Sequence, residues 1–212
     1  MGSQRFQELE KRITELRHSF LPVEFDPTGF YEDLTYEHTR AFRVLAHAEF
    51  ESFIEDRVIG LIDDAMGRWQ TKGEVSAVLL AAVAYRETAH PIPESLNEAA
   101  LKKKKFPTLK ERVEGARSDF HRYVRNQNHG IKEKNLLRML LPIGIDQDAL
   151  NTEWLSDVDT WATARGDAAH KGAKVQVQPD PLKEKDAVER VLAGFRELDE
   201  QIDPQNLPGT AP

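Results

Sequence analysis

Two side chains in the last third of the chain could act together on a phosphate ester. Arg165 and His170 are separated by four residues in the segment WATARGDAAHKG. A guanidinium stays charged and offers a planar pair of donors to phosphate oxygens. An imidazole titrates near neutral pH and suits proton transfer. Asp167 lies three residues before His170, a spacing that could hold the imidazole in one tautomer.

The residues before Arg165 predict the helix that must position this pair. Apolar side chains recur there at helical spacing and form a stripe that Arg165 extends; they are Trp154, Val158 and Trp161. On a straight helix, Arg165 and His170 would lie about 140° apart around the axis. Gly166 and Gly172 predict that the helix frays here, which would let both side chains point to one site. Alternatively, Arg165 pairs with a surface acid and His170 is a solvated helix-end residue.

Helical periodicity dominates the rest of the chain. A first helix covers Met1 to Phe20, and an uninterrupted apolar pattern predicts a long helix from about Asp33 to Trp69. Further helix starts are predicted at Thr71/Glu74, Ser95/Glu98, Thr108/Glu111, Ile131, Asn151 and Asp180-Pro181. The alternating stretch from Lys174 to Gln178 is expected to be extended. The predicted fold class is all-α, a helical bundle with one long central helix and extra edge helices.

The predicted organisation has three parts. Residues 1–24 form an N-terminal helix, residues 25–202 form the helical domain, and residues 203–212 form a disordered tail. The tail contains three prolines and one glycine in ten residues, a composition that disfavours a packed core.

Composition points to a protein of the reducing cytoplasm that does not span a membrane. Apolar residues make up 40% of the chain, and there is no cysteine, so disulfides and thiolate chemistry are excluded. The first twenty residues lack the apolar core of a signal peptide. No apolar run approaches the roughly 20 residues of a membrane-spanning helix.

The net charge of −7 hides an uneven distribution. Between Lys102 and Arg138 there are twelve Lys or Arg and four Asp or Glu, whereas the remainder of the chain is strongly acidic. Such a segment can attract a polyanion. The RNA-binding candidates are Lys102, Lys103, Lys104, Lys105, Arg122 and Arg125. The alternative is a solubilising linker followed by an ordinary solvated helix face.

The R-x4-H spacing at the end of a late helix resembles the motif of the HEPN superfamily. The opening of the long helix, RAFRVLAHAEFESFI from Arg40 to Ile54, is also similar to HEPN families of bacterial defence and toxin–antitoxin loci. The similarity spans about Asp33 to Ile202. It implies a metal-independent endoribonuclease without cofactors, usually a homodimer with two motifs at one cleft. His170 would then act as general base or acid and Arg165 would hold the scissile phosphate.

The resemblance also implies regulatory partners, and it leaves alternative functions open. An antitoxin or a nucleotidyltransferase would regulate such a toxin. The family often has a polar residue directly after the arginine, where this chain has Gly166. Arg43, His47 and Glu51, spaced four apart, could support the catalytic pair or form a structural polar network. The rival functions are a non-catalytic HEPN-like module that binds RNA, nucleotide or a protein partner, and a purely structural helical-bundle or adaptor protein.

Overall fold

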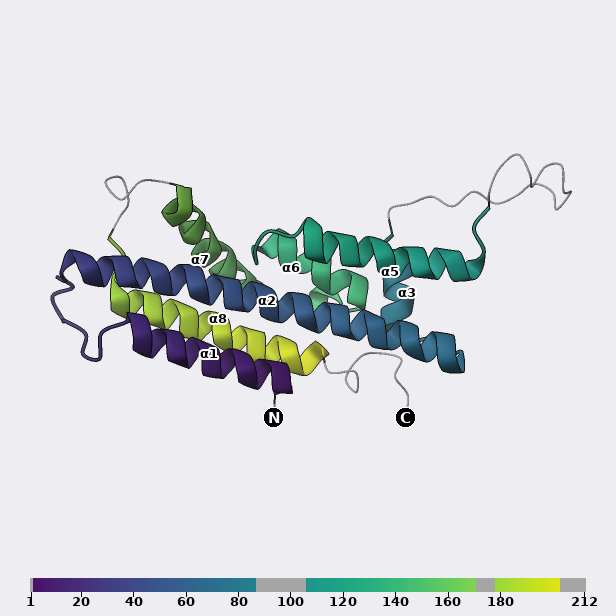
Figure 1. Cartoon of the computed structure of the whole chain (residues 1–212), viewed down its shortest axis with the longest axis horizontal. Helices are drawn as coiled ribbons and strands as arrows, with labels where there is room; N and C mark the ends of the chain where they lie inside the picture. The colour runs from purple at the N-terminus through teal and green to yellow at the C-terminus, as the bar shows by residue number, and fades with distance from the viewer. Residues whose placement is uncertain (1, 87–105, 171–177, 203–212) are drawn as a thin grey trace, which may run out of the picture.

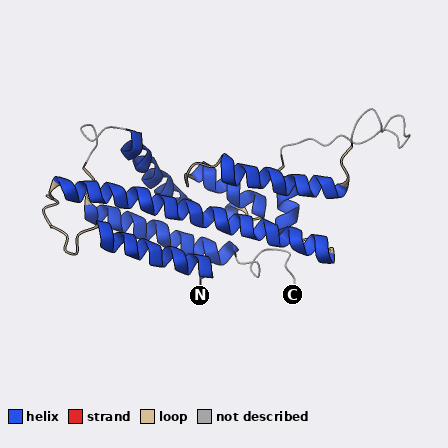
Figure 2. Cartoon of the chain, viewed as in Figure 1, coloured by secondary structure: helices blue, strands red, loops and turns tan. Residues whose placement is uncertain are grey.

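The computed structural model describes residues 2–86, 106–170 and 178–202, and for residues 165–170 it describes the backbone alone. Every regular element in these ranges is helical (Figure 2), which confirms the predicted all-α class. The elements are α1 (Gln4–Phe20), α2 (Asp33–Lys72), α3 (Ala77–Ala84), α5 (Leu109–Asn126), α6 (Glu133–Leu140), the 3₁₀ turns η1 (Leu141–Ile143) and η2 (Gln147–Ala149), α7 (Thr152–His170) and α8 (Pro181–Ile202).

The central element is α2, a helix of 40 residues that extends about 60 Å at 1.5 Å per residue. Figure 1 shows α1 and α8 along one side of it, and α7, α6, α5 and α3 along the other. Its apolar residues are therefore buried on more than one face of the helix. Phe42, Phe53, Val58 and Ile62 have almost no exposed surface. This confirms the predicted long helix, which extends three residues beyond Trp69.

Aromatic rings join α2 to its neighbours in one core. The Phe50 ring of α2 stacks on the Phe195 ring of α8 with centroids 5.0 Å apart. Trp154 of α7 meets Phe195 edge to face at 5.2 Å, and Phe6 of α1 meets Phe53 at 5.8 Å. Edge-to-face and offset pairs add to the free energy gained by burial. The elements α1, α2, α7 and α8 consequently share a single hydrophobic core.

Three of the predicted helix starts agree with the structure, those at Thr108, Asn151 and Asp180. Thr108 and Glu111 form a capping box at the start of α5. The Asn151 side chain accepts a hydrogen bond from the Trp154 amide at 3.0 Å, and Asp180 Oδ1 accepts one from the Leu182 amide at 2.8 Å. These side chains satisfy amides that have no partner within the helix. The predicted helix at Ile131 begins later, at Glu133, and ends at Leu140 before a 3₁₀ turn.

The predicted capping box at Thr71 and Glu74 is wrong. Thr71 is still inside α2, where its hydroxyl donates to the Gly67 carbonyl at 2.7 Å. The helix ends at Gly73, which has a φ of 73°, a left-handed conformation that glycine adopts without the steric cost of a Cβ. The next helix is capped by Ser76 instead. The predicted helix after Ser95, most of the extended stretch from Lys174 and the tail from Asp203 lie outside the described residues.

Gly194 of α8 leaves room for the Trp154 ring of α7. A Cβ at this position would lie 2.2 Å from the Trp154 ring, and that ring is fixed by a hydrogen bond from its Nε1 to the Val191 carbonyl at 3.2 Å. We expect Gly194→Ala to lower the free energy of unfolding by about 3 kcal/mol, the upper end of the usual cost of overpacking. Urea denaturation followed by circular dichroism would measure the change.

Gly60→Ala is the matched control, because a Cβ there would meet nothing within 4 Å. It should raise the free energy of unfolding by up to about 1 kcal/mol, the helix-propensity difference between glycine and alanine. Equal stability of the two variants would show that the Gly194 contact does not limit the packing of α7 on α8.

Candidate functional site

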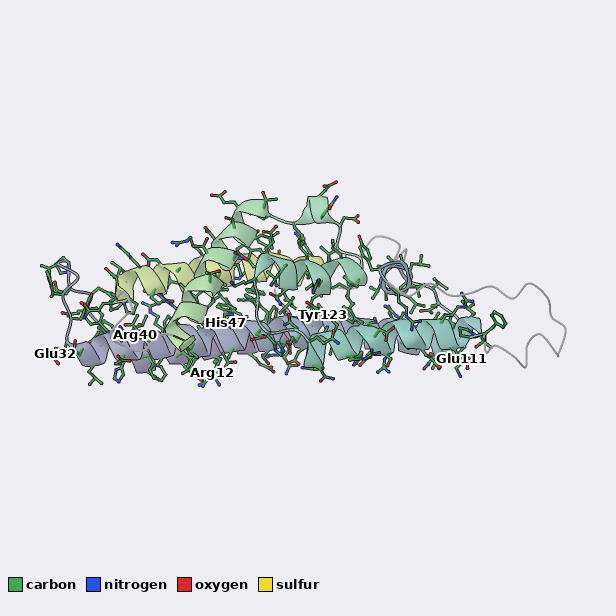
Figure 3. The ribbon with its side chains drawn as sticks, turned by 90° about the horizontal axis from the view of Figure 1, so that it is seen from above. Arg12, Glu32, Arg40, His47, Glu111 and Tyr123 are labelled. Atoms are coloured by element: carbon green, nitrogen blue, oxygen red, sulfur yellow. The ribbon has the colours of Figure 1, made fainter. Side chains whose placement is uncertain are left out.

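The R-x4-H segment forms the last turns of α7. This helix starts near α6 and runs toward the N-terminal half of α2 (Figure 1). Seen from above, its C-terminal end lies over the stretch of α2 between Arg40 and His47 (Figure 3). In Figure 1, however, these last turns rise away from α2, and α7 meets the polar row of α2 further back, where the Trp161 ring stacks on His47.

The prediction that α7 frays at Gly166 is wrong. The helix continues through Gly166 to His170, because one glycine inside a helix costs only about 1 kcal/mol relative to alanine. The Cα positions of Arg165 and His170 are therefore separated by about 140° around the helix axis. The side chains of Arg165, Asp167 and His170 lie outside the described residues.

One turn before Arg165, a buried polar cluster joins three helices. We call Arg43, His47, Trp161 and Glu184 the Trp161 cluster. The Trp161 indole donates from Nε1 to Glu184 Oε1 at 2.7 Å, and the Arg43 Nε donates to Glu184 Oε2 at 2.9 Å. The His47 ring stacks on the Trp161 ring with centroids 5.8 Å apart.

The carboxylate of Glu184 holds this cluster together. Its side chain is 3% exposed, and removing a charge from water is costly unless it is paired and hydrogen-bonded. Arg43 supplies the opposite charge and Trp161 supplies a neutral donor, so both carboxylate oxygens are satisfied. The cluster thereby fixes Trp161, and with it the start of the last α7 turns, against α2 and α8.

Arg43, His47 and Glu51 follow one another on α2 but differ in burial and contacts. Arg43 and His47 belong to the buried cluster, while Glu51 is partly exposed and its Oε2 lies 3.7 Å from His47 Nδ1. These contacts are those of a structural polar network. The row contacts α7 at Trp161, and a role of the row in supporting the R-x4-H segment stays a prediction.

Several cations of the basic helix α5 pair with acids of α2 or of α5 itself. Arg125 pairs with Asp56 at 3.0 Å and also lies near Glu55. Arg122 pairs with Asp119 of its own helix. Both guanidinium groups remain about half exposed, so they can still meet a ligand while paired. Of the other proposed RNA contacts, Lys102, Lys103, Lys104 and Lys105 lie outside the described residues.

Asp63 of α2 pairs with two basic side chains of α5. Its Oδ1 accepts a hydrogen bond from Arg117 Nε at 2.6 Å and lies 2.8 Å from His121 Nε2. Burial by itself would raise the pKa of the Asp63 carboxyl, but hydrogen bonds from Arg117 and His121, with their charges, outweigh it and lower that pKa. His121, which shares its face with Arg125, therefore binds an α2 acid.

Sequence reasoning missed Glu184. A signal was present, because Glu184 occupies a stripe position with Val188, Val191 and Phe195, all of them buried. An acid on such a stripe needs a buried partner. Its partners come from positions more than twenty residues away along the chain, and the sequence pattern alone does not identify them.

Two further kinds of feature are absent from the described ranges. No group of three or more His, Asp or Glu residues there is arranged to hold a metal ion. None of the helices described is both long and apolar enough to cross a bilayer.

Comparison with known families decides the relationship. A family model described as RiboL-PSP-HEPN matches residues 7–203. The chain belongs to this HEPN family. No curated protein and no solved structure gives a significant match. HEPN domains are commonly ribonuclease-like or otherwise related to RNA, and the resemblance inferred from the motif is confirmed at the level of the superfamily.

Loss of the Glu184 carboxylate should destabilise the HEPN domain. Glu184→Ala leaves Arg43 without its buried counter-charge and Trp161 without its acceptor, so we expect the free energy of unfolding to fall by about 3–5 kcal/mol. Glu184→Gln retains an acceptor for Trp161 and should cost less. Urea denaturation of the purified variants would measure both changes.

Glu189→Ala is the control on the same helix. Glu189 is about half exposed and pairs with Arg17 and Lys185, and exposed pairs contribute about 1 kcal/mol or less. A loss in Glu184→Ala no larger than in Glu189→Ala would contradict the central role of the cluster.

The lowered pKa of Asp63 predicts a dependence of stability on pH. Because this pKa is lower in the folded state, Asp63 stabilises the fold above its ordinary value of 3.8 and loses that effect as the pH falls below it. Asp63→Asn should therefore be less stable than the parent at pH 7, and the difference should shrink on acidification to about pH 3. Urea midpoints at both pH values would test this.

Asp64→Asn is the neighbouring control, because Asp64 is exposed and pairs within α2 with Arg68. It should change the urea midpoint little at either pH. A difference between Asp63→Asn and the parent that grows with acidification would contradict the assignment.

Proposed function

We propose that this HEPN domain is an endoribonuclease that cleaves RNA without a metal ion, using Arg165 and His170. The observation that carries the proposal is the R-x4-H segment at the end of α7, in a chain that the family model matches over residues 7–203. The Trp161 cluster supports it, since it anchors α7 one turn before Arg165.

The chemistry needs only an acid–base group and a fixed cation. The ribose 2′-hydroxyl attacks the adjacent phosphorus, so a bond from O2′ to phosphorus forms while the bond from phosphorus to the 5′-oxygen breaks. His170 takes the proton from the 2′-hydroxyl or gives one to the departing 5′-oxygen. Arg165 binds the non-bridging oxygens, where negative charge accumulates in the transition state. RNA supplies the nucleophile itself.

A second copy of the chain is the expected partner at this site. Arg165 and His170 are about 140° apart on one continuous helix, so a cleft that uses both groups is more easily built from two copies. Large apolar residues lie exposed on the loop between α1 and α2, which is on the α1 side of α2 in Figure 1, and at the start of α2; they are Val23, Phe30 and Leu34. Such patches are typical of interfaces, and a two-fold dimer would pair them.

The biological role is proposed by relationship. We infer that the nuclease serves defence or acts as a toxin in the bacterial cytoplasm, controlled by an antitoxin or a nucleotidyltransferase. The support is the likeness of the α2 opening to HEPN families from such loci. Asp167 is proposed to orient His170 in place of the polar residue that these families often carry at the position of Gly166.

Substitution of either motif residue should abolish cleavage. His170→Ala removes the acid–base group and should slow cleavage of a single-stranded RNA by at least about 100-fold. Arg165→Ala removes the phosphate-binding cation and should act similarly. Cleavage would be measured on gels with purified protein in EDTA, where the parent should remain active.

His18→Ala, on the exposed face of α1, is the matched control and should cleave like the parent. If the parent binds the RNA and leaves it intact, the non-catalytic RNA-binding module is the correct function. If the parent neither binds nor cuts RNA, the chain is a structural bundle and the proposal fails.

A further inference from the structure

A cavity of about 520 Å³ lies between α3, α5 and the segment formed by α6 and η1. These elements pack on the C-terminal half of α2, whereas the R-x4-H end of α7 lies over its N-terminal half (Figure 1). The two places are therefore distinct. The volume is within the range of sites that bind small ligands.

The floor of the cavity is apolar. It includes Ala82 of α3, Phe120 of α5, Leu137 of α6 and Pro142 of η1. Ala82 and Phe120 are buried in the fold, so this surface is built by the packing of four elements. It offers a place for a flat, weakly polar group.

Three guanidinium groups also line the cavity, against one carboxylate. Arg86 Nε lies 2.7 Å from Asp119 Oδ2, and Arg122 pairs with the other oxygen of Asp119. Asp119 thereby holds two arginines at the cavity. Its single charge leaves a net positive lining, because Arg138 is the third cation there.

Arg138 is the cation best placed to meet an anion. Among the residues that the structure describes, no carboxylate lies within ion-pair distance of it. Its guanidinium carbon lies 6.0 Å from the centre of the Tyr123 ring, and the side chain is exposed. Burial raises the pKa of Tyr123, an effect that the charge of Arg138 opposes in part, so the phenol remains a hydrogen-bond donor at neutral pH.

Tyr85 provides an aromatic surface at the same cavity. It ends α3, lines the cavity and has 54% of its surface exposed. Exposed aromatic rings beside arginines form typical stacking surfaces for nucleobases. The cavity thus combines a stacking surface, an apolar floor and cations that can bind a phosphate in a bidentate manner.

We infer that this cavity binds a nucleoside phosphate, with the phosphate at Arg122 and Arg138 and the base between Tyr85 and the apolar floor. A free nucleotide and one nucleotide of an RNA strand offer the same chemistry. The inference does not depend on the proposed nuclease activity, because it uses no residue of the R-x4-H segment.

Binding of adenosine 5′-monophosphate to the full chain, measured by isothermal titration calorimetry, tests the inference. Arg138→Ala and Arg122→Ala should each weaken binding of a nucleoside phosphate at least tenfold, and Arg138→Lys should weaken it less because it keeps the charge. Adenosine and ribose 5-phosphate should each bind more weakly than the nucleotide, since each lacks half of the recognised groups. Thermal melts would confirm that every variant is folded.

Arg190→Ala is the matched control, because Arg190 is an exposed arginine on α8 with only a long contact of 3.7 Å to Asp157. It should bind the nucleotide like the parent. Binding that falls equally in Arg190→Ala and Arg138→Ala would indicate a diffuse charge effect and would overturn the site.

An octamer of adenosine ribonucleotides distinguishes the two sources of the ligand, and His170→Ala protein would be used so that the strand stays intact. If the monophosphate binds and depends on Arg138, the ligand is a free nucleotide. If only the octamer binds and depends on Arg138, the cavity holds one unit of an RNA strand. If neither binds at millimolar concentration, or both bind equally to Arg138→Ala, the inference is wrong. Loss of cleavage in His170→Ala with binding retained would separate this site from the proposed nuclease.

Discussion

The buried carboxylate of Glu184 is the interaction on which the arrangement of the candidate site depends. It belongs to α8, yet its two oxygens bind Arg43 of α2 and Trp161 of α7. A charge this deeply buried is tolerated only when all its partners are in place, so the three helices are held in one relative position. The last turns of α7, which carry the R-x4-H segment, begin immediately after this contact.

The second constraint is the length of α2. A helix about 60 Å long presents different surfaces along its axis. Its N-terminal half meets α7 and α8 through the Trp161 cluster. Its middle carries Asp56 and Asp63, which neutralise the basic face of α5. Part of the positive charge of the basic segment is therefore paired between neighbouring helices.

The two proposed sites lie apart in this domain and differ in their chemical groups. The last turns of α7 carry Arg165 and His170, and the Trp161 cluster fixes the helix one turn before them. At the cavity between α3, α5 and α6, Asp119 orders two arginines, while Arg138 lies over the Tyr123 ring. The first is proposed to serve proton transfer at a phosphate, and the second to recognise a phosphate beside an aromatic group.

Local patterns in the sequence determined the all-α class, the long central helix, the caps at Thr108 and Asp180 and the buried faces of Trp154 and Trp161, because helical period and capping act over a few residues. Only the tertiary structure decided that α7 continues through Gly166, that Glu184 is buried beside Arg43, and that arginines from three segments meet at one cavity. These features depend on contacts between residues far apart in the chain, and no local spacing encodes which distant partner a charged side chain will meet.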